Sequence, residues 1–277
     1  MNSLTFKRFT GLLRREVLEH PNLFIIVPAI VALIWLLLNI LLMRLGAGSF
    51  LQNTISNFLD SMTITQIGPL LLPLALAFVV ALVICNLSYL GDALYQDRKD
   101  MSMLFWQSMP VSNLATVFSK IVTITLLLPL GHLVMFVLVH LILLGWLVFE
   151  PDSSMELAVV GKLSLAFLYS MLLLYLTIIL NVLWVFPLVG WILLFSAFAR
   201  RIPLFWSLGV YILISLIEDL LIGTQFLANW GASRRAFPVV LSPEDFFNYL
   251  LNYDILIGVL LGSILVAGAV LMRRFVD

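Results

Sequence analysis

The sequence predicts an all-α membrane protein with six transmembrane helices. Its 277 residues are 62% hydrophobic and only 11% charged, whereas soluble domains carry about 25% charged residues. Mean hydropathy is +1.12, and the apolar residues gather in runs long enough to cross a hydrocarbon core about 30 Å thick. We also expect an amphipathic interfacial helix before the first span and a short cytoplasmic coupling helix between spans 2 and 3.

The N-terminal residues 3–20 have the spacing of an amphipathic helix. One side carries apolar residues at helical intervals, and the basic residues lie elsewhere: the apolar set is Phe6, Phe9, Leu13 and Val17. A helix of this kind rests on a membrane surface. The alternative is a solvated leader that is amphipathic by chance. Pro21 then ends the helix or bends the chain into the first span.

Six apolar runs are expected to span the membrane, at about 23–45, 67–90, 121–149, 170–199, 203–226 and 255–272. The fourth lies in a run of about 43 residues, roughly 64 Å of straight helix, which is too long for one simple span. We expect an edge helix over 157–169 and then a span with a kink at Pro187. Two spans joined by a tight turn near Pro187 are the alternative.

The basic residues set the expected orientation, because cytoplasmic loops are enriched in Lys and Arg. With six spans and both termini in the cytoplasm, eleven of the 15 basic residues lie inside: Lys7, Arg8, Arg14, Arg15, Arg98, Lys99, Lys120, Arg200, Arg201, Arg273 and Arg274. Outside lie Arg44, Lys162, Arg234 and Arg235. In the last external segment, Ser242 followed by Pro243 and two acids predicts a short helix from Pro243 to about Leu251.

The polar stretch Gly91–Lys120 interrupts the apolar runs and is expected in the cytoplasm. It carries four adjacent charges, Asp97 to Asp100, which lipid does not solvate, so we expect them in water. An aromatic-rich segment follows. Asp100 and Pro110 are suitable as the cap and the stop of a short helix over about 100–108. The alternative for this helix is that its aromatic residues dip into the lipid interface.

The chain resembles the ABC-2-type permeases of ATP-binding-cassette transporters in two stretches. The first contains Asp97-Arg98, Met101 to Leu104, Met109-Pro110-Val111-Ser112 and Ser119-Lys120. The second, similar to a bacterial subset, contains Trp184, Pro187, Trp191, Ser196, Arg200-Arg201 and Pro203. Two features differ from the usual pattern: Asp97 stands where Glu is common, and Met101-Ser102 where Gly-Thr is common. The layout of the spans is similar over most of the chain.

The resemblance implies a transport subunit without ATPase motifs of its own, in a bacterial cytoplasmic (inner) membrane. Two cytosolic ATPase subunits, which bind ATP and Mg, would pair with this subunit and a second permease subunit, identical or different. The likeness points to export, and nothing in the sequence selects a substrate. The coupling contacts with the ATPase are then expected from Asp97, Arg98, Lys99, Leu104, Phe105, Trp106 and Pro110.

Polar and aromatic residues inside the spans are the candidates for a substrate path. Carboxylates in a span are costly and by default functional; Glu218 and Asp219 are such a pair, with a rim position or a helix cap as the alternative. Asn181 has the residue type of a helix–helix contact. Trp184 and Phe186 fall in mid-span, where helix packing is the alternative.

Other classes of function have less support. A net charge of zero argues against nucleic acid as a partner, and the single Cys85 allows no intrachain disulfide. No phosphate-binding loop is present in the sequence. An intramembrane enzyme would need His132 or His140 beside Glu218, but the two histidines are eight residues apart on one span and form no metal pair. A membrane assembly factor without transport is the remaining alternative.

Overall fold

The computed structural model describes residues 3–42, 44–45, 62–99, 112–149, 157–234 and 237–273, and every element in these ranges is helical. Those labelled η are short 3-10 or π-helical turns. The elements in chain order are α1 (Ser3–Glu19), η1 (Asn22–Ile26), α2 (Val27–Leu42), α4 (Ile64–Leu71), η3 (Leu72–Ala75), α5 (Leu76–Asp92), α6 (Tyr95–Lys99), α8 (Asn113–Val122), η4 (Thr123–Leu127), α9 (Leu128–Phe149), α10 (Leu157–Trp184), α11 (Phe186–Phe198), α12 (Pro203–Ile222), α13 (Phe226–Ser233), α14 (Pro243–Leu250) and α15 (Tyr253–Met272).

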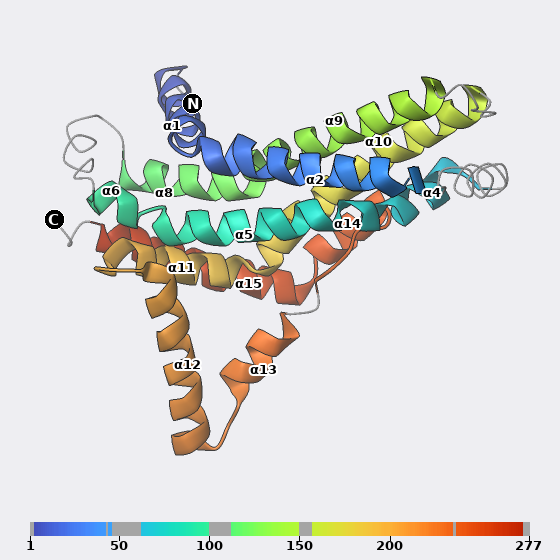
Figure 1. The fold of residues 1–277 in the computed structure, drawn as a ribbon. Coiled ribbons are helices and arrows are strands. Elements are labelled where there is room, and N and C mark those ends of the chain that lie inside the picture. Colours follow the sequence, from blue (N-terminus) through green and yellow to red (C-terminus); the bar gives the residue numbers. More distant parts are fainter. Residues whose placement is uncertain are drawn as a thin grey trace.

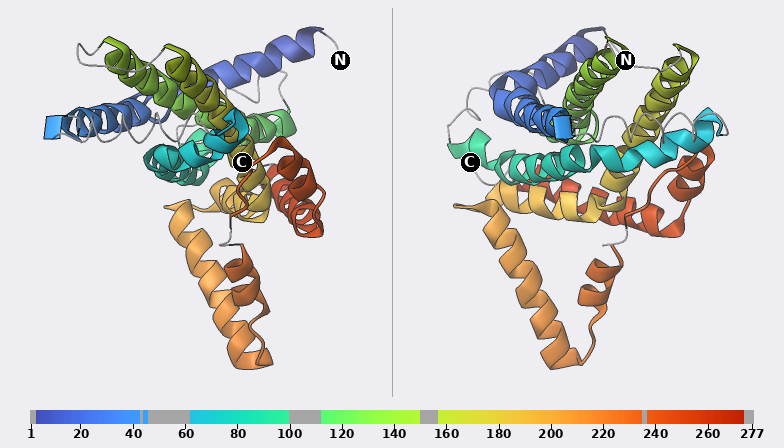
Figure 2. Two further views of the ribbon diagram at one scale, coloured as in Figure 1. Left: turned by 90° about the vertical axis from the view of Figure 1, so that its right-hand side faces the viewer. Right: turned by 45° about the vertical axis from the view of Figure 1, so that its right-hand side comes forward.

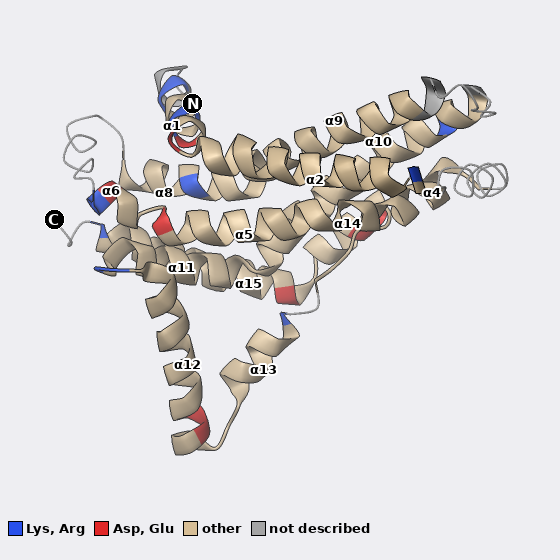
Figure 3. Ribbon diagram, in the orientation of Figure 1, with Lys and Arg blue, Asp and Glu red and all other residues tan. Residues whose placement is uncertain are grey.

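Most of the long helices form one elongated bundle (Figure 1). One end of the bundle, which we call the terminal end, holds α1, α6 and the last turn of α15. The other end, the opposite end, holds α4 and α14. Figure 3 shows most Lys, Arg, Asp and Glu toward the two ends of the bundle and near the tip of α12, with acidic ribbon also at the start of α15, while α2, α5 and α9 are tan along their middle. This distribution is typical of a membrane-spanning bundle.

Six helical segments are long and apolar enough to cross a membrane, as the sequence predicts: Asn22–Leu42, Ile64–Lys99, Asn113–Trp146, Ala158–Trp184, Pro203–Ile222 and Tyr253–Met272. The chain is therefore a multi-pass, all-α membrane protein. The second and third segments begin or end several residues outside the predicted spans, because the helices continue beyond the apolar run. Both described ends of the chain lie at the terminal end (Figure 1), as expected for an even number of spans.

The fourth apolar run differs from the prediction in its internal boundaries. Residues 157–169 are not a separate edge helix, since α10 continues unbroken from Leu157 to Trp184. The break comes at Val185, beside the predicted kink at Pro187, which lies in the first turn of α11. Proline has no N–H for the preceding turn, so a new helix starts there. The chain then continues toward the terminal end instead of turning back (Figure 1).

Helix α12 leaves the bundle at its terminal end and projects away from it, and α13 returns toward the bundle (Figure 2). Only 6% of the central part of α12 is buried in the protein, the least of the six spans. Its boundary was predicted at 226, but Gly223 in the left-handed conformation (φ 69°) ends the helix and Phe226 begins α13. Before α12, Ile202 has φ 43°, which is unusual for a β-branched residue.

Helices α11 and α15 pack closely against each other, and this packing depends on glycine. A Cβ at Gly190 would lie 2.6 Å from the carbonyl oxygen of Gly262, and a Cβ at Gly262 would lie 2.7 Å from the carbonyl oxygen of Phe186. Small residues allow this approach between membrane helices. At the opposite end, α14 has the predicted cap: Ser242 accepts a hydrogen bond from the Asp245 N–H, and the Asp245 side chain accepts from the Ser242 N–H.

Candidate functional site: a buried ion network

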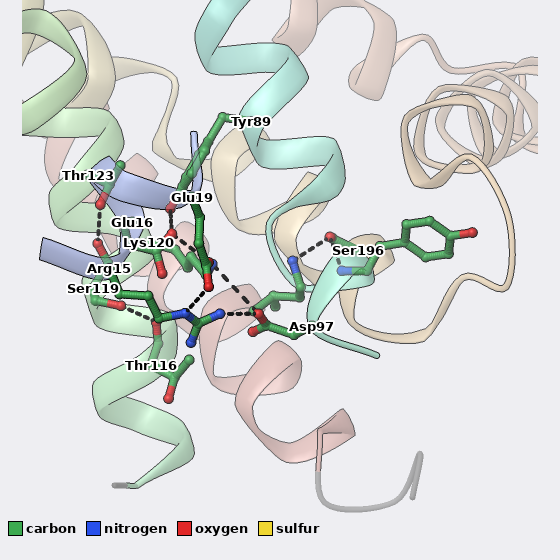
Figure 4. A network of polar contacts seen from close by, with 12 residues as sticks. Arg15, Glu16, Glu19, Tyr89, Asp97, Thr116, Ser119, Lys120, Thr123 and Ser196 are labelled. Carbon is green, nitrogen blue, oxygen red and sulfur yellow. Dashed lines mark hydrogen bonds and ion pairs between the residues drawn. The ribbon is translucent and has the colours of Figure 1, made fainter. Parts of the chain in front are cut away.

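A network of charged side chains lies at the terminal end, where α1, α6, α8 and α15 meet (Figure 4). Helix α1 packs against α8 through Phe9 and Phe118, whose ring centroids are 5.7 Å apart. The apolar side of α1, from Phe9 onward, is therefore partly covered by protein. This packing brings the polar residues of α1 to the start of the third span.

Glu16 is the first centre of this network. Its side chain is completely buried, and Oε2 accepts hydrogen bonds from Lys120 Nζ at 2.8 Å and from Tyr89 Oη at 2.6 Å. The Lys120 ammonium also lies 5.7 Å from the centre of the Tyr89 ring, within the range of a cation–π interaction. A buried carboxylate is tolerated only with such partners. Glu16 thus joins the N-terminal helix to the second and third spans.

Asp97 is the second centre, and its position corrects the prediction that this charge lies in water. Its side chain is only 5% exposed, and three cations surround it: Arg15 at 2.8 Å, Arg273 at 3.3 Å and Lys120 at 3.9 Å. Asp97 is stable out of water because Arg15, Lys120 and Arg273, from three other parts of the chain, take the place of water around its carboxylate. Within the described part of the chain, ion pairs join six charged side chains in this network: Glu16, Glu19, Asp97, Arg15, Lys120 and Arg273.

Arg98 anchors α6, the short helix that also carries Asp97, to the end of α11. Its guanidinium donates to two carbonyl oxygens at the end of α11, those of Ser196 at 3.1 Å and Ala199 at 2.7 Å. The last carbonyls of a helix lack partners within it, so a cation there completes their hydrogen bonding. Arg98 therefore binds helix-end carbonyls, whereas the neighbouring Lys99 is exposed.

A serine hydroxyl completes the junction between α5, α6 and α11. Ser196 Oγ accepts from the N–H groups of Leu94 and Tyr95 at 3.0 and 3.1 Å, and donates to the carbonyl of Gly91 at 2.9 Å. The Ser196 side chain is fully buried. It satisfies backbone groups left open where α5 ends and α6 begins.

The surroundings shift the pKa values of Arg15 on α1 and of His20, which directly follows α1; both residues lie outside the spans. For Arg15, burial lowers the pKa, but the hydrogen bond to Glu19 and the charge of Asp97 outweigh it, so the pKa stays above its ordinary value. Burial lowers the pKa of His20, and the charge of Lys120 lowers it further. Arg15 is thus firmly charged, and His20 favours the neutral imidazole.

Glu16, Glu19 and His20 form a group whose ligand atoms all lie within 4.8 Å of one another. Carboxylate and imidazole are metal ligands in general. Here Lys120 already binds Glu16, and Arg15 binds Glu19 at 2.7 Å. Because Lys120 and Arg15 already neutralise these carboxylates, a metal ion would add positive charge next to two cations. The group is therefore better suited to holding helices together.

The residues predicted for a substrate path are not brought together as one lining. Asn181 donates to the carbonyl of Pro238, and Trp184 donates to the carbonyl of Arg234, so both tie α10 to the segment before α14. Phe186 belongs to the buried core.

The carboxylate pair of this predicted path lies on α12. Glu218 accepts hydrogen bonds from the Phe226 and Leu227 N–H groups at 2.6 and 2.9 Å, and Asp219 accepts from Gln225. These contacts favour the alternative of a helix cap, because carboxylates stabilise the N-terminus of a helix such as α13. The structure therefore places Glu218 and Asp219 in a role at the α12–α13 turn.

Of the predicted coupling residues, the structure places Asp97, Arg98 and Lys99 on α6. The rest, Leu104, Phe105, Trp106 and Pro110, lie outside the described residues, as does the expected helix over 100–108. Sequence reasoning missed Glu16 and Tyr89. The spacing of Glu16, four residues after Leu12, was a signal available in the sequence, and the structure buries both side chains.

Comparisons with known proteins do not assign the chain to a family. No protein-family model, no curated protein and no solved structure matches it.

Proposed function

We propose that the chain is the membrane-spanning subunit of an ATP-driven ABC-2-type exporter in a bacterial cytoplasmic membrane, with both termini in the cytoplasm. Two copies of a cytosolic ATPase, which bind ATP and Mg, would act on it and on a second permease subunit, identical or different. The chain contributes the path and the mechanical link, and the ATPase contributes the chemistry. The resemblance around Asp97-Arg98 and Pro110 supports this assignment.

The observation that carries the proposal is the anchoring of both flanks of segment 100–111. On one flank, Asp97 is bound by cations from α1, α8 and α15, and Arg98 by the end of α11. On the other flank, Ser112 caps α8 by accepting from the Ala115 N–H at 3.2 Å. A force on the segment would therefore reach the spans directly, because the residues next to it are fixed to four helices.

Two features of the network suit a mechanical link. Charged hydrogen bonds are stronger and more directional than neutral ones, so they keep the relative angles of α1, α6, α8 and α15. Their burial also protects them from screening by salt. If the residues that flank segment 100–111 were flexible or solvated, the movement of a partner would be lost there and would not reach the spans.

The test is purification of the tagged chain from its native membrane in lipid nanodiscs. We expect a stoichiometric partner whose sequence carries a phosphate-binding loop, and ATP hydrolysis by the complex. The chain produced alone should hydrolyse no ATP, since its sequence has no such loop. Hydrolysis by a rigorously pure chain, or a native complex that contains no ATP-binding subunit, would contradict the proposal. The second result would favour an assembly factor.

A further inference from the structure

Helix α1 lies across the end of the bundle and not along it. Figures 1 and 2 both show α1 at the terminal end, where it extends sideways from the bundle axis. The long apolar helices set the direction in which the bundle crosses a membrane. A helix that lies across this direction at the end of the bundle is parallel to the membrane surface, at the depth of the lipid headgroups.

The charges of α1 run in the opposite order to the one that stabilises an isolated helix. Anions are favourable near the N-terminus of a helix and cations near its C-terminus. The segment from Ser3 to Arg15 contains basic residues and no acidic residue, whereas Glu16 and Glu19 follow it. Figure 3 shows the basic part of α1 away from the bundle and its acidic part next to the bundle. Glu16 and Glu19 are placed there by their ion pairs with Lys120 and Arg15.

Four residues form an exposed stripe along the outer side of α1: Lys7, Gly11, Arg14 and Leu18. Steps of four, three and four residues keep them on one side of a helix, and Glu16, nine residues after Lys7, is about two and a half turns away and so on the opposite side. A Cβ added at Gly11 would meet nothing within 4 Å, and Leu18 is 67% exposed. The stripe is therefore open to a ligand along its length.

The two cations of this stripe have no partner within the described part of the chain. No described carboxylate pairs with the Lys7 ammonium or with the Arg14 guanidinium. The two residues are separated by about 10 Å along the helix, and Gly11 between them has no side chain. Both long side chains can therefore converge on one anion above Gly11, which lets the anion approach the helix backbone.

We propose that this stripe binds the headgroup of an anionic phospholipid. Arg14 donates two parallel hydrogen bonds to the phosphate, Lys7 supplies a second positive charge, and Leu18 contacts the beginning of an acyl chain. The cations select a lipid with net negative charge, because they repel the ammonium group that a zwitterionic lipid also carries. Lipid on the outer side of α1 and the Glu16–Lys120 pair on the inner side then hold the helix in place.

The membrane position of α1 and the exposed Leu18 favour a lipid over a soluble phosphate. A soluble anion would bind equally well to cations in open water, where an exposed leucine adds nothing. A phospholipid presents its phosphate and its first apolar carbons at the depth where α1 lies. The site goes beyond the proposed transport function and does not depend on an ATPase partner.

Native mass spectrometry of the full chain in detergent tests the site, with phosphatidylglycerol and phosphatidylcholine of identical acyl chains as probes. We expect the dissociation constant of the first bound phosphatidylglycerol to be about fivefold lower than that of phosphatidylcholine. Lys7→Gln combined with Arg14→Gln should reduce this preference to less than about twofold. Glycerol phosphate in excess, which has the anionic group without acyl chains, should not displace the bound lipid.

Arg200→Gln combined with Arg201→Gln is the matched control. It also removes two exposed cations, and these lie just before α12, which leaves the bundle at the same terminal end. The preference of this control should stay within about twofold of the wild type. Gly11→Leu keeps every charge and replaces glycine by a better helix former. Its side chain stands between the two cations, so we expect about threefold weaker binding of phosphatidylglycerol.

Four results would overturn the proposal: equal affinity of the wild type for the two lipids, an equal loss of preference in the Arg200 and Arg201 control, wild-type binding by either stripe variant, and displacement of the lipid by glycerol phosphate. The comparison of the two lipids on the wild type needs no variant, so it decides the question even if a variant fails to accumulate. Because the sample contains this chain alone, the results are independent of whether an ATPase partner exists.

Discussion

The ammonium of Lys120 lies 2.8 Å from Oε2 of Glu16, and the two side chains are 2% and 0% exposed. These residues are 104 positions apart in the sequence. Their contact fixes the N-terminal helix α1 to the start of the third span, and Lys120 also lies 3.9 Å from Asp97. This buried pair therefore connects α1 with α8, and Lys120 also brings α8 close to Asp97 on α6.

Replacing Lys120 by Met should destabilise the protein strongly. Removing one partner of a buried pair leaves an uncompensated charge and typically costs about 3–5 kcal/mol. We expect a loss of this size in the free energy of unfolding, measured by denaturant titration in detergent with tryptophan fluorescence. The double variant Glu16→Gln with Lys120→Met should recover a large share of the loss, because the uncompensated charge of Glu16 is then removed and Asp97 keeps its pairs with Arg15 and Arg273.

Lys7→Met is the control for this pair. Lys7 lies on the same helix but is exposed, so its loss should change the free energy of unfolding by less than about 0.5 kcal/mol. A single Lys120→Met variant as stable as Lys7→Met would show that the pair contributes nothing to the fold.

His20 should make the stability depend on pH. Burial and the charge of Lys120 hold its pKa in the folded protein below the ordinary value, which is about 6.5 and applies to the unfolded chain. As the pH falls below this value, the unfolded chain binds the proton first, so the folded state loses stability. We expect the midpoint temperature of thermal unfolding to decrease as the pH is lowered from 7.5 to 5.5.

His20→Phe should flatten that part of the profile. The phenyl ring can keep the edge contact with Tyr89, where the His20 ring now lies at 5.2 Å, but it does not titrate. An unchanged slope in the variant would assign the pH dependence to other groups.

Arg98→Ala should uncouple the protein without unfolding it. Arg98 is half-buried and binds the last carbonyls of α11, so its loss frees α6 while the buried network remains. We expect normal amounts in the membrane but weaker ATPase binding or transport, measured by pull-down and by flux. Lys99→Ala is the matched control, since Lys99 is exposed. Equal ATPase binding and equal flux in the two variants would contradict the role proposed for Arg98.

Local pattern was sufficient to predict much of the fold. Apolar runs indicated the six long helices, and Ser242 with Pro243 indicated α14. The pattern located the break in the fourth run near Pro187, but the boundary predicted at residue 169 was wrong. Residues 157–169 continue into α10 because nothing in them stops a helix. The direction of α12 was likewise hidden, since its exposed apolar surface reads the same whether the helix lies in the bundle or beside it.

The candidate site was predicted only in part. Asp97 and Arg98 were singled out from the polar stretch. The burial of Asp97 was not predictable, because its three cations come from residues 15, 120 and 273. Four adjacent charges look solvated until the partners are in place. Glu16 looked like one more charge on an amphipathic helix.

The proposed topology puts the two ends of the bundle on opposite sides of the membrane and is directly testable. Residue 99 lies on α6 at the terminal end and residue 245 on α14 at the opposite end (Figure 1). In a Cys85→Ser background, Asp245→Cys should react with an impermeant thiol reagent in whole cells and Lys99→Cys should not. Cys85 itself is buried. The reverse pattern of labelling would exclude the proposed orientation.

Site-specific photocrosslinking at position 106 tests the central claim most directly. In intact cells, Trp106→p-benzoylphenylalanine should give one dominant adduct after irradiation, and mass spectrometry should identify in it a protein with a phosphate-binding loop. The same substitution at Phe247, on α14 at the opposite end, should not give this adduct. If position 106 crosslinks only to lipid or to a protein without a nucleotide site, the polar stretch is not the contact through which an ATPase moves this membrane protein.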